Sequence, residues 1–198
     1  MKIIPTPLEG VLLIEPDLFK DPRGFFMETF QKQKYAKAGI HCSFVQDNLS
    51  FSNKHTLRGL HYQLCHPQAK LIYVIKGAIF DVAVDIRFGS PTFGQWTGVE
   101  LSDENRRQLM VPEGFAHGFC VISKTAHVAY KCSDFYAPED EQGILWSDPG
   151  INITWPSLSP VLSLKDQQFD CLHDLSKQSL PAYIPKKNCS RLRLEIGK

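Results

Sequence analysis

The sequence lacks a long uninterrupted apolar run and any strong excess of charge of one sign. No segment approaches the roughly 20 apolar residues of a membrane-spanning helix. The N-terminal stretch MKIIPTPLEGVLLIEP has no basic segment followed by an unbroken apolar one, which is the pattern of a secretion signal. The 22 Lys and Arg nearly cancel the 21 Asp and Glu, so no bulk positive field favours nucleic acid or anionic membranes. We therefore predict a cytoplasmic protein that binds neither nucleic acid nor a membrane.

The cysteines also lack the spacing of a metal site or a disulfide framework. The chain has six Cys, and no two of them form a C-x-x-C pair. Without a secretion signal, this arrangement predicts buried free thiols in a reducing compartment.

Short apolar or alternating runs do occupy most of the chain, and Gly, Pro, Asn and Asp separate them. This pattern is typical of many antiparallel strands and predicts an all-β sandwich or barrel. The clearest strand is AIFDVAVDIR, residues 78–87, in which Phe80, Val82, Val84 and Ile86 share one face.

Further elements are predicted from the same patterns and their flanking turn residues. Strands are expected at residues 10–14, 24–29, 46–52, 70–76, 94–101, 107–111, 118–122 and 126–132. Lys76–Gly77 is expected to form a tight turn between two of them. Two helices are expected, one at residues 31–39 and one opening at Ser163 and running to Leu175.

The length of 198 residues and the 43% hydrophobic content suit a single domain. We place this domain at residues 1–185. The basic residues 186–198 are predicted to form a tail that is either mobile or added as an edge to a partner.

Six sequence blocks carry a resemblance to a known family. In order they are DPRGFFMETF, QDNLSFS, TLRGLHYQ, DVAVDIRFGSPTFG, VPEGFAHGF and ILWSDP, and SLKD follows them. Together they span about residues 21–166, and they resemble the dTDP-4-dehydrorhamnose 3,5-epimerase family of nucleotide-sugar enzymes. The resemblance implies a cupin-like jelly-roll barrel with short flanking helices. It also implies a homodimer with strands exchanged between subunits, and no metal or organic cofactor.

Inverting a sugar carbon beside a ketone requires a base on one face, an acid on the other and a group that holds the enolate. Histidine suits proton abstraction near neutral pH, because its ordinary pKa is about 6.5. By resemblance, His61 is the base, Asp166 orients it, Tyr130 is the acid and Lys70 holds the enolate oxygen. From the residues alone, Asp166 also fits the first turn of a helix opened by Ser163, and Tyr130 also fits a core aromatic.

The alternation of a regular strand would send Arg58 and His61, three residues apart, to opposite faces. Gly59 between them is predicted to mark a bulge that turns both side chains inward.

A protein that binds a dTDP-sugar needs guanidinium and ammonium groups that pair with the diphosphate. By resemblance, the residues that contact the nucleotide sugar are Arg23, Glu28, Gln46, Asn48, Arg58, His117, Glu141 and Lys165. The implied reaction converts dTDP-4-dehydro-6-deoxy-D-glucose into dTDP-4-dehydro-L-rhamnose.

Three other functions stay open on the sequence. One is an enzyme that inverts a single carbon or shifts the keto group, and another is a non-catalytic sugar-binding cupin. The third is a metal-dependent cupin oxygenase, whose site needs two histidines one residue apart on a strand. Gln63 stands where the second of these histidines would follow His61.

Overall fold

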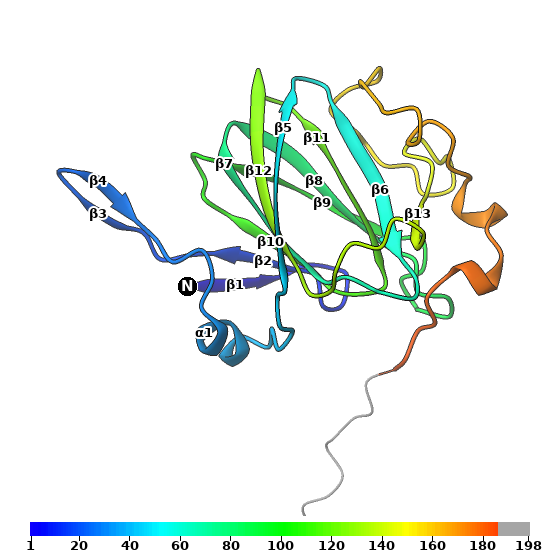
Figure 1. Cartoon of the computed structure of the whole chain (residues 1–198), viewed down its shortest axis with the longest axis horizontal. Coiled ribbons are helices and arrows are strands. Elements are labelled where there is room, and N and C mark those ends of the chain that lie inside the picture. The colour runs from blue at the N-terminus through cyan, green and yellow to red at the C-terminus, as the bar shows by residue number, and fades with distance from the viewer. Residues whose placement is uncertain (186–198) are drawn as a thin grey trace, which may run out of the picture.

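The computed structural model describes residues 1–185, and most of its regular structure is β-strand (Figure 1). Its helices are short: α1 (Lys32–Lys37) and two 3-10 turns at Leu172–Asp174 and Lys177–Ser179. The strands are β1 (Lys2–Pro5), β2 (Leu12–Glu15), β3 (Phe19–Asp21), β4 (Gly24–Phe26), β5 (Gln46–Asn53), β6 (Leu57–Gln63), β7 (Lys70–Lys76), β8 (Ala78–Asp85), β9 (Trp96–Ser102), β10 (Gln108–Val111), β11 (Phe115–Val121), β12 (Thr125–Cys132) and β13 (Glu141–Gly143). Among these residues, no helix is long and apolar enough to cross a membrane.

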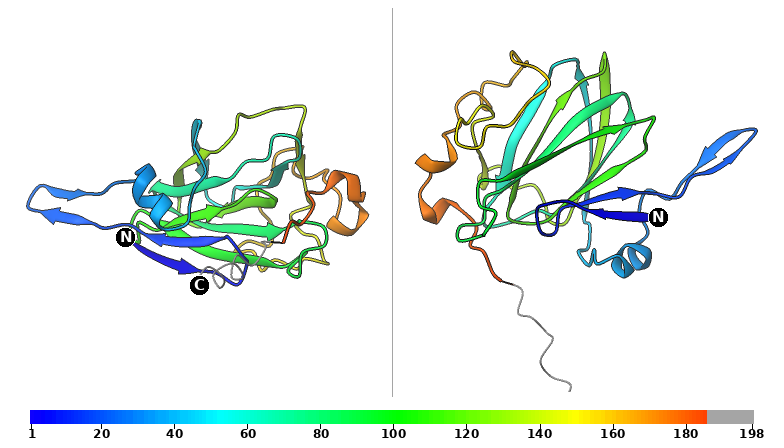
Figure 2. Two further views of the ribbon diagram at one scale, coloured as in Figure 1. Left: turned by 90° about the horizontal axis from the view of Figure 1, so that it is seen from below. Right: turned by 180° about the vertical axis from the view of Figure 1, so that it is seen from behind.

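Two antiparallel sheets face each other and form the body of the fold (Figure 2). The larger sheet has the strand order β1-β2-β10-β7-β12-β5, and the smaller has the order β13-β6-β11-β8-β9. Strands β3 and β4 pair with each other and form a separate hairpin that projects from the body (Figure 1). These facing sheets confirm the predicted all-β, cupin-like jelly roll with short flanking helices.

Strand β8 is buried on both of its faces because each face meets a different apolar cluster. Ile79 and Ala83 belong to the cluster between the two sheets. Val82, Val84 and Ile86 belong to a second cluster, which the C-terminal loops cover from outside the smaller sheet. The predicted apolar face of residues 78–87 is therefore confirmed, and burial of each such side chain is worth about 1.5–3 kcal/mol.

The predicted tight turn at Lys76–Gly77 is wrong as a hairpin turn. β7 pairs with β10 and β12, whereas β8 pairs with β9 and β11, so the connection crosses from one sheet to the other. Gly77 makes this crossing with a φ of 88°. A Cβ on Gly77 would lie 2.1 Å from the backbone oxygen of Thr125, so the close approach itself requires glycine.

The predicted helix from Ser163 to Leu175 is also wrong. Residues 164–167 form one turn, and only Leu172–Asp174 is helical, as a 3-10 turn. The first turn does begin as predicted, since the backbone N–H of Asp166 donates to Ser163 Oγ at 3.1 Å. The helix does not continue, because the backbone after this turn forms hydrogen bonds with distant parts of the chain. The backbone oxygen of Asp170, for example, accepts from the N–H of Leu145 at 2.9 Å.

The other predicted elements agree with the structure to different degrees. Helix α1 lies within the predicted 31–39, and Gln31 caps it by accepting from the Lys34 N–H. The strand predicted at 24–29 is shorter in the structure. Strand β4 ends at Phe26, which is the last residue of β4 that pairs with β3. The tail predicted at 186–198 lies outside the described residues.

The described cysteines are free, as predicted, but they are not all buried. Cys120 and Cys132 are buried inside the sheets, whereas Cys65 is exposed in the connection after β6. Cys189 lies outside the described residues. The prediction of buried thiols is therefore confirmed at Cys120 and Cys132 and wrong at Cys65, whereas Cys42 and Cys171 are half-buried.

Candidate active site

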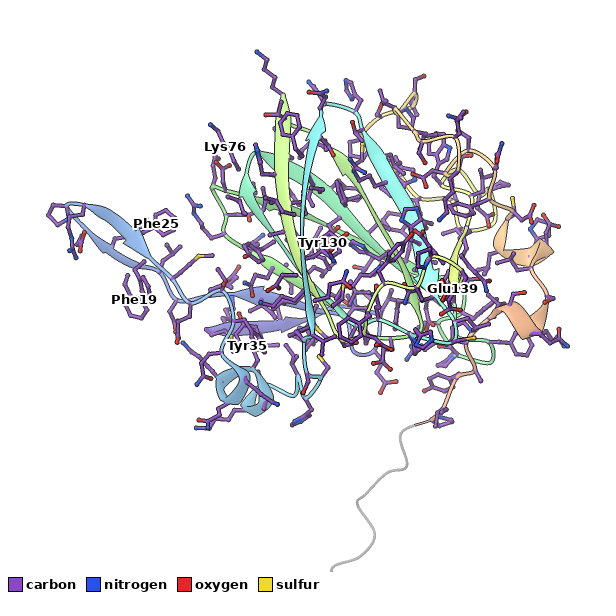
Figure 3. All side chains as sticks on the ribbon, viewed as in Figure 1. Phe19, Phe25, Tyr35, Lys76, Tyr130 and Glu139 are labelled. Atoms are coloured by element: carbon purple, nitrogen blue, oxygen red, sulfur yellow. The ribbon has the colours of Figure 1, made fainter. Side chains whose placement is uncertain are left out.

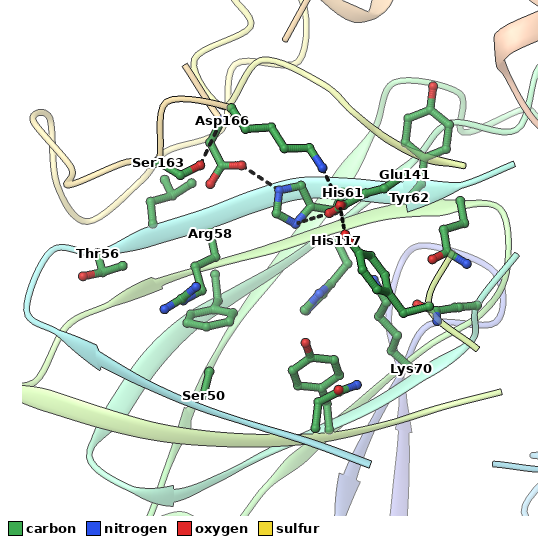
Figure 4. A pocket seen from close by; sticks show the side chains of 18 of the residues that line it. Ser50, Thr56, Arg58, His61, Tyr62, Lys70, His117, Glu141, Ser163 and Asp166 are labelled. Atoms are coloured by element: carbon green, nitrogen blue, oxygen red, sulfur yellow. Dashed lines mark hydrogen bonds and ion pairs between the residues drawn. The ribbon is translucent and has the colours of Figure 1, made fainter. Parts of the chain in front are cut away.

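A cavity of about 690 Å³ opens between the two sheets. Its walls come from β5, β7 and β12 of the larger sheet, from β6, β11 and β13 of the smaller one, and from the loop at residues 161–166. Ten of the twelve predicted site residues line it: Gln46, Asn48, Arg58, His61, Lys70, His117, Tyr130, Glu141, Lys165 and Asp166. Figure 4 shows most of these side chains pointing into the same space.

A bulge in β6 places Arg58 and His61 on the same side of the strand. His61 pairs with His117 of β11, and Arg58 pairs with Phe119, so three steps along β6 match two steps along β11. Gly59 takes up the extra residue with a φ of 122°. The predicted bulge is confirmed, and it is why both side chains reach the cavity.

His61 is held at one ring nitrogen and open at the other. Its Nε2 lies 2.7 Å from Oδ1 of Asp166, which is a buried carboxylate (Figure 4). Because a carboxylate accepts, this contact places the ring hydrogen on Nε2 and leaves Nδ1 as the basic nitrogen. The edge of Phe169 packs against the imidazole, with ring centroids 5.8 Å apart.

Asp166 is stabilised as a carboxylate. Burial raises its pKa, but hydrogen bonds from His61 and Ser163, together with the charge of His61, outweigh burial and leave the pKa below its usual range. A carboxylate in this position both orients the imidazole and stabilises the cation that forms when the ring takes a proton.

Glu141 lies on the open side of the His61 ring. Its Oε1 is 3.8 Å from Nδ1 of His61. Its Oε2 accepts from the hydroxyl of Tyr136 at 2.6 Å and pairs with the ammonium of Lys165. Burial raises the pKa of Glu141, yet the hydrogen bonds from Lys165 and Tyr136 leave it lower than usual.

Tyr130 and Lys70 lie on the larger sheet, on strands β12 and β7. Figure 3 labels Tyr130 in the body of the fold. Burial, with a smaller effect of Cys132, raises the pKa of Tyr130, and the positive charge of Arg58 opposes that rise. Burial lowers the pKa of Lys70, against the opposing pull of Cys132 and Glu141.

A second histidine–aspartate pair lies deeper in the wall. Nε2 of His117 is 2.8 Å from Oδ1 of Asp81, and both residues are buried. The second oxygen of Asp81 is buried without a hydrogen-bond partner among the described residues. Asp81 is not among the site residues predicted from the sequence, although the alternation of residues 78–87 does place it on the face that turns away from Val82.

Two further cavity contacts were missed because no local pattern marks them. Phe169 reaches His61 only because Gly143 has no side chain: a Cβ there would lie 2.3 Å from the Phe169 ring. Tyr136 reaches Glu141 from the loop after β12. Neither position has a period or a spacing that the sequence alone relates to His61.

Arg23 and Glu28 do not join the cavity of their own chain. Arg23 lies in the turn of the β3–β4 hairpin, where its side chain is 90% exposed and its guanidinium pairs with Asp21. Glu28 follows the hairpin and pairs with Lys34 at 3.0 Å. The structure therefore separates these two predicted residues from the other ten.

One group of side chains in residues 1–185 has the composition of a metal site, and it lies outside the cavity lining. It consists of Asp148, Cys171 and His173. The two oxygens of Asp148 already accept the backbone N–H groups of Gly150 and Leu172, each at 2.7 Å, so this carboxylate fastens the C-terminal segment.

The fold and the cavity place this chain in the class of cupin-like jelly-roll enzymes. The family model described as dTDP-4-dehydrorhamnose 3,5-epimerase matches residues 5–174. The chain belongs to this family. It is an isomerase by its family membership.

Named relatives support the same family. A dTDP-4-dehydrorhamnose 3,5-epimerase from Shigella flexneri is 56% identical over 168 residues, which cover 84% of this chain and 93% of the relative. The crystal structure of a dTDP-6-deoxy-D-glucose-3,5-epimerase from Legionella pneumophila, in complex with dTDP-4-keto-L-rhamnose, has a TM-score of 0.91 and 50% identity. The structural match covers 93% of this chain and 99% of the Legionella chain. A dTDP-4-dehydrorhamnose 3-epimerase from Streptomyces niveus is 42% identical over 84% of this chain and 82% of the relative.

Proposed function

We propose that the protein inverts C3 and C5 of dTDP-4-dehydro-6-deoxy-D-glucose and so produces dTDP-4-dehydro-L-rhamnose. The observation that carries this proposal is the placement of His61 and Tyr130 on opposite walls of one cavity. His61 lies on β6 of the smaller sheet, and Tyr130 lies on β12 of the larger sheet. A sugar between them loses a proton on one face and gains one on the other, which inverts the carbon.

The roles of the catalytic residues follow from this placement. Nδ1 of His61 removes the proton beside the ketone, and Asp166 stabilises the resulting imidazolium through Nε2. The ammonium of Lys70 offsets the negative charge on the enolate oxygen. Tyr130 donates its phenolic proton to the other face of the carbon, and the nearby charge of Arg58 stabilises the phenolate that remains.

Both inversions use the same groups because C3 and C5 flank the same ketone at C4. Each carbon in turn presents its proton to His61 while the keto oxygen stays near Lys70. The 3,5-epimerases from Shigella flexneri and Legionella pneumophila share a larger fraction of identical residues with this chain than the 3-epimerase from Streptomyces niveus does. This supports the double inversion over a single one.

The remaining cavity residues suit the nucleotide and the diphosphate. Arg58 supplies a guanidinium and Lys165 an ammonium, which are the groups that pair with phosphate oxygens. The Nε of Arg58 donates to Ser52 Oγ at 3.0 Å, and this bond fixes the direction of the side chain. We assign polar contacts with the nucleotide sugar to Gln46, Asn48, His117 and Glu141 as well.

A homodimer completes this site in our proposal. The rings of Phe19 and Phe26 lie beside each other in the projecting hairpin, tilted and with centroids 6.5 Å apart, yet both residues are more than half exposed. Figure 3 shows how far the hairpin stands from the body. Strand β5 at the cavity mouth pairs only with β12 among the described strands, so one of its edges is open. A hairpin from a partner subunit that covers this edge would bring Arg23 and Glu28 to the cavity and bury the exposed rings.

A mixing experiment tests the shared site. Arg23→Ala and His61→Ala each remove one required group, and we expect each variant to be nearly inactive. In a mixed dimer, one site receives the intact His61 and the intact Arg23 from different subunits. Random mixing is therefore expected to restore activity at about a quarter of the sites. If mixing after reversible subunit exchange restores no activity, Arg23 and His61 act from the same chain or the protein is no dimer.

The reaction itself is tested by nuclear magnetic resonance in D₂O with dTDP-4-dehydro-6-deoxy-D-glucose. The proposal predicts deuterium at both C3 and C5 together with an inverted configuration at both carbons. Deuterium at one carbon alone would indicate a mono-epimerase or keto-isomerase. No deuterium at either carbon would leave a non-catalytic sugar-binding cupin as the better explanation.

A further inference from the structure

In a double inversion, His61 takes up a proton twice in one turnover. After the first inversion, His61 is protonated on Nδ1 and Tyr130 is a phenolate. The second inversion requires both groups to return to their starting states while the sugar is still bound. Asp166 occupies Nε2 of His61, so the proton must leave from the Nδ1 side.

Glu141 is the carboxylate on that side, and it connects the cavity with the surface. Its side chain is mostly buried, and its Oε1 lies 3.8 Å from Nδ1 of His61. Its Oε2 accepts from Tyr136, whose residue is 51% exposed, and it pairs with Lys165, whose side chain is 46% exposed. The dashed contacts in Figure 4 run from Asp166 through His61 to Glu141.

We propose that Glu141 is a proton relay that resets His61 between the two inversions. This inference rests on the proposed function. The imidazolium breaks its Nδ1–H bond and gives the proton to Oε1 of Glu141, which leaves a neutral imidazole and a carboxylic acid. The carboxyl group then rotates so that the protonated oxygen faces Tyr136, and it gives its proton to the hydroxyl oxygen of Tyr136 as that hydroxyl releases its own hydrogen to water. The carboxylate and the neutral phenol are restored, and Tyr130 takes a proton from water.

The surroundings of Glu141 suit a group that holds a proton only in passing. The distance of 3.8 Å is too long for a hydrogen bond, so the transfer needs a small shift of Glu141 or one bridging water. The ammonium of Lys165 favours the carboxylate over the acid and so speeds the release of the proton. A group that only bound the sugar would need no path to the surface.

The variant Glu141→Gln tests the relay because glutamine keeps the shape and an oxygen that accepts but carries no transferable proton. In a single turnover in D₂O, we expect the second sugar carbon to lag behind the first, so that the ratio of the second exchange rate to the first falls about tenfold or more below its wild-type value. Added imidazole, a diffusible base, is expected to shorten this lag. Glu139→Gln removes the same charge from an exposed position in the loop just before β13 and is expected to change neither rate.

Other outcomes would overturn the relay. Two carbons that exchange at wild-type rates in Glu141→Gln would show that the proton leaves elsewhere. Equal slowing of both carbons without a response to imidazole would make Glu141 a binding or structural group. If Glu141→Gln does not fold, Tyr136→Phe removes the exit while it keeps the carboxylate, and wild-type rates in that variant would contradict the path. A wild-type protein that exchanges neither carbon would overturn the proposed function together with the relay.

Discussion

His61 and His117 are opposite each other on the paired strands β6 and β11, and each is bonded through Nε2 to an aspartate, at 2.7 and 2.8 Å. The His61 side chain is 26% exposed and the His117 side chain only 9%. Asp166, the partner of His61, comes from a loop, whereas Asp81, the partner of His117, comes from the neighbouring strand β8.

This difference teaches that a histidine–aspartate contact does not by itself make a base. His61 keeps Nδ1 open to the cavity, and Tyr130 lies on the opposite wall. His117 is buried and bonded to Asp81, and its place in the cavity wall suits a residue that positions the substrate. Because the two pairs have different surroundings, substitutions in them should have different effects.

The largest effect is expected for His61→Ala. Turnover is expected to fall by about 10²- to 10⁴-fold, since a well-placed base contributes that much. The affinity for dTDP is expected to stay close to that of the wild type, because we assign the binding of the nucleotide to other residues. Steady-state kinetics and calorimetry with dTDP measure the two quantities, and a variant that keeps most of its turnover would contradict the role of His61.

A different response is expected for His117→Ala. The loss of one hydrogen bond to a polar substrate should raise KM by roughly tenfold. The value of kcat should stay within a few-fold, because His117 moves no proton in this account. Initial rates over a range of substrate concentrations separate the two constants, and a fall in kcat as large as that of His61→Ala would place both histidines in the chemistry.

The support behind His61 is tested by Gly143→Ala. The added Cβ would meet the Phe169 ring at 2.3 Å, and we expect a loss of about 1–3 kcal/mol in unfolding free energy from overpacking. The double variant with Phe169→Leu should lose less than the two single changes together. Urea unfolding of all three variants measures this, and strict additivity would mean that the contact does not matter.

The smallest effect concerns pH. The pKa of Asp166 is lower in the folded protein than its ordinary value of about 3.9. Its contribution to stability is therefore present above that value and is lost as the pH falls through the folded pKa. Asp166→Asn should flatten the acidic part of the stability profile, from about pH 4 downward, measured by thermal unfolding. An unchanged profile would show that the carboxylate is not stabilised by folding.

The sequence predicted the strands well because alternation and turn residues are local signals, and it predicted the cavity residues through blocks that keep their order along the chain. Asp166 shows the limit of such signals. The predicted helix start does form, since the backbone N–H of Asp166 donates to Ser163 Oγ. The helix does not continue, because the next residues form hydrogen bonds with distant parts of the chain. Arg23 shows another limit: its place in the chain gives no hint that it stands apart from the cavity.

The most direct test of the account compares Asp166→Asn with Asp81→Asn at saturating substrate in D₂O. We predict that Asp166→Asn slows deuterium entry at both carbons by about 10²-fold, since the imidazole loses its orientation and its counter-charge. Asp81→Asn should keep the rate within roughly tenfold of the wild type, because it changes a group that only holds His117. Equal losses in the two variants, or a larger loss in Asp81→Asn, would contradict the assignment of His61 and Asp166 as the pair that moves the proton.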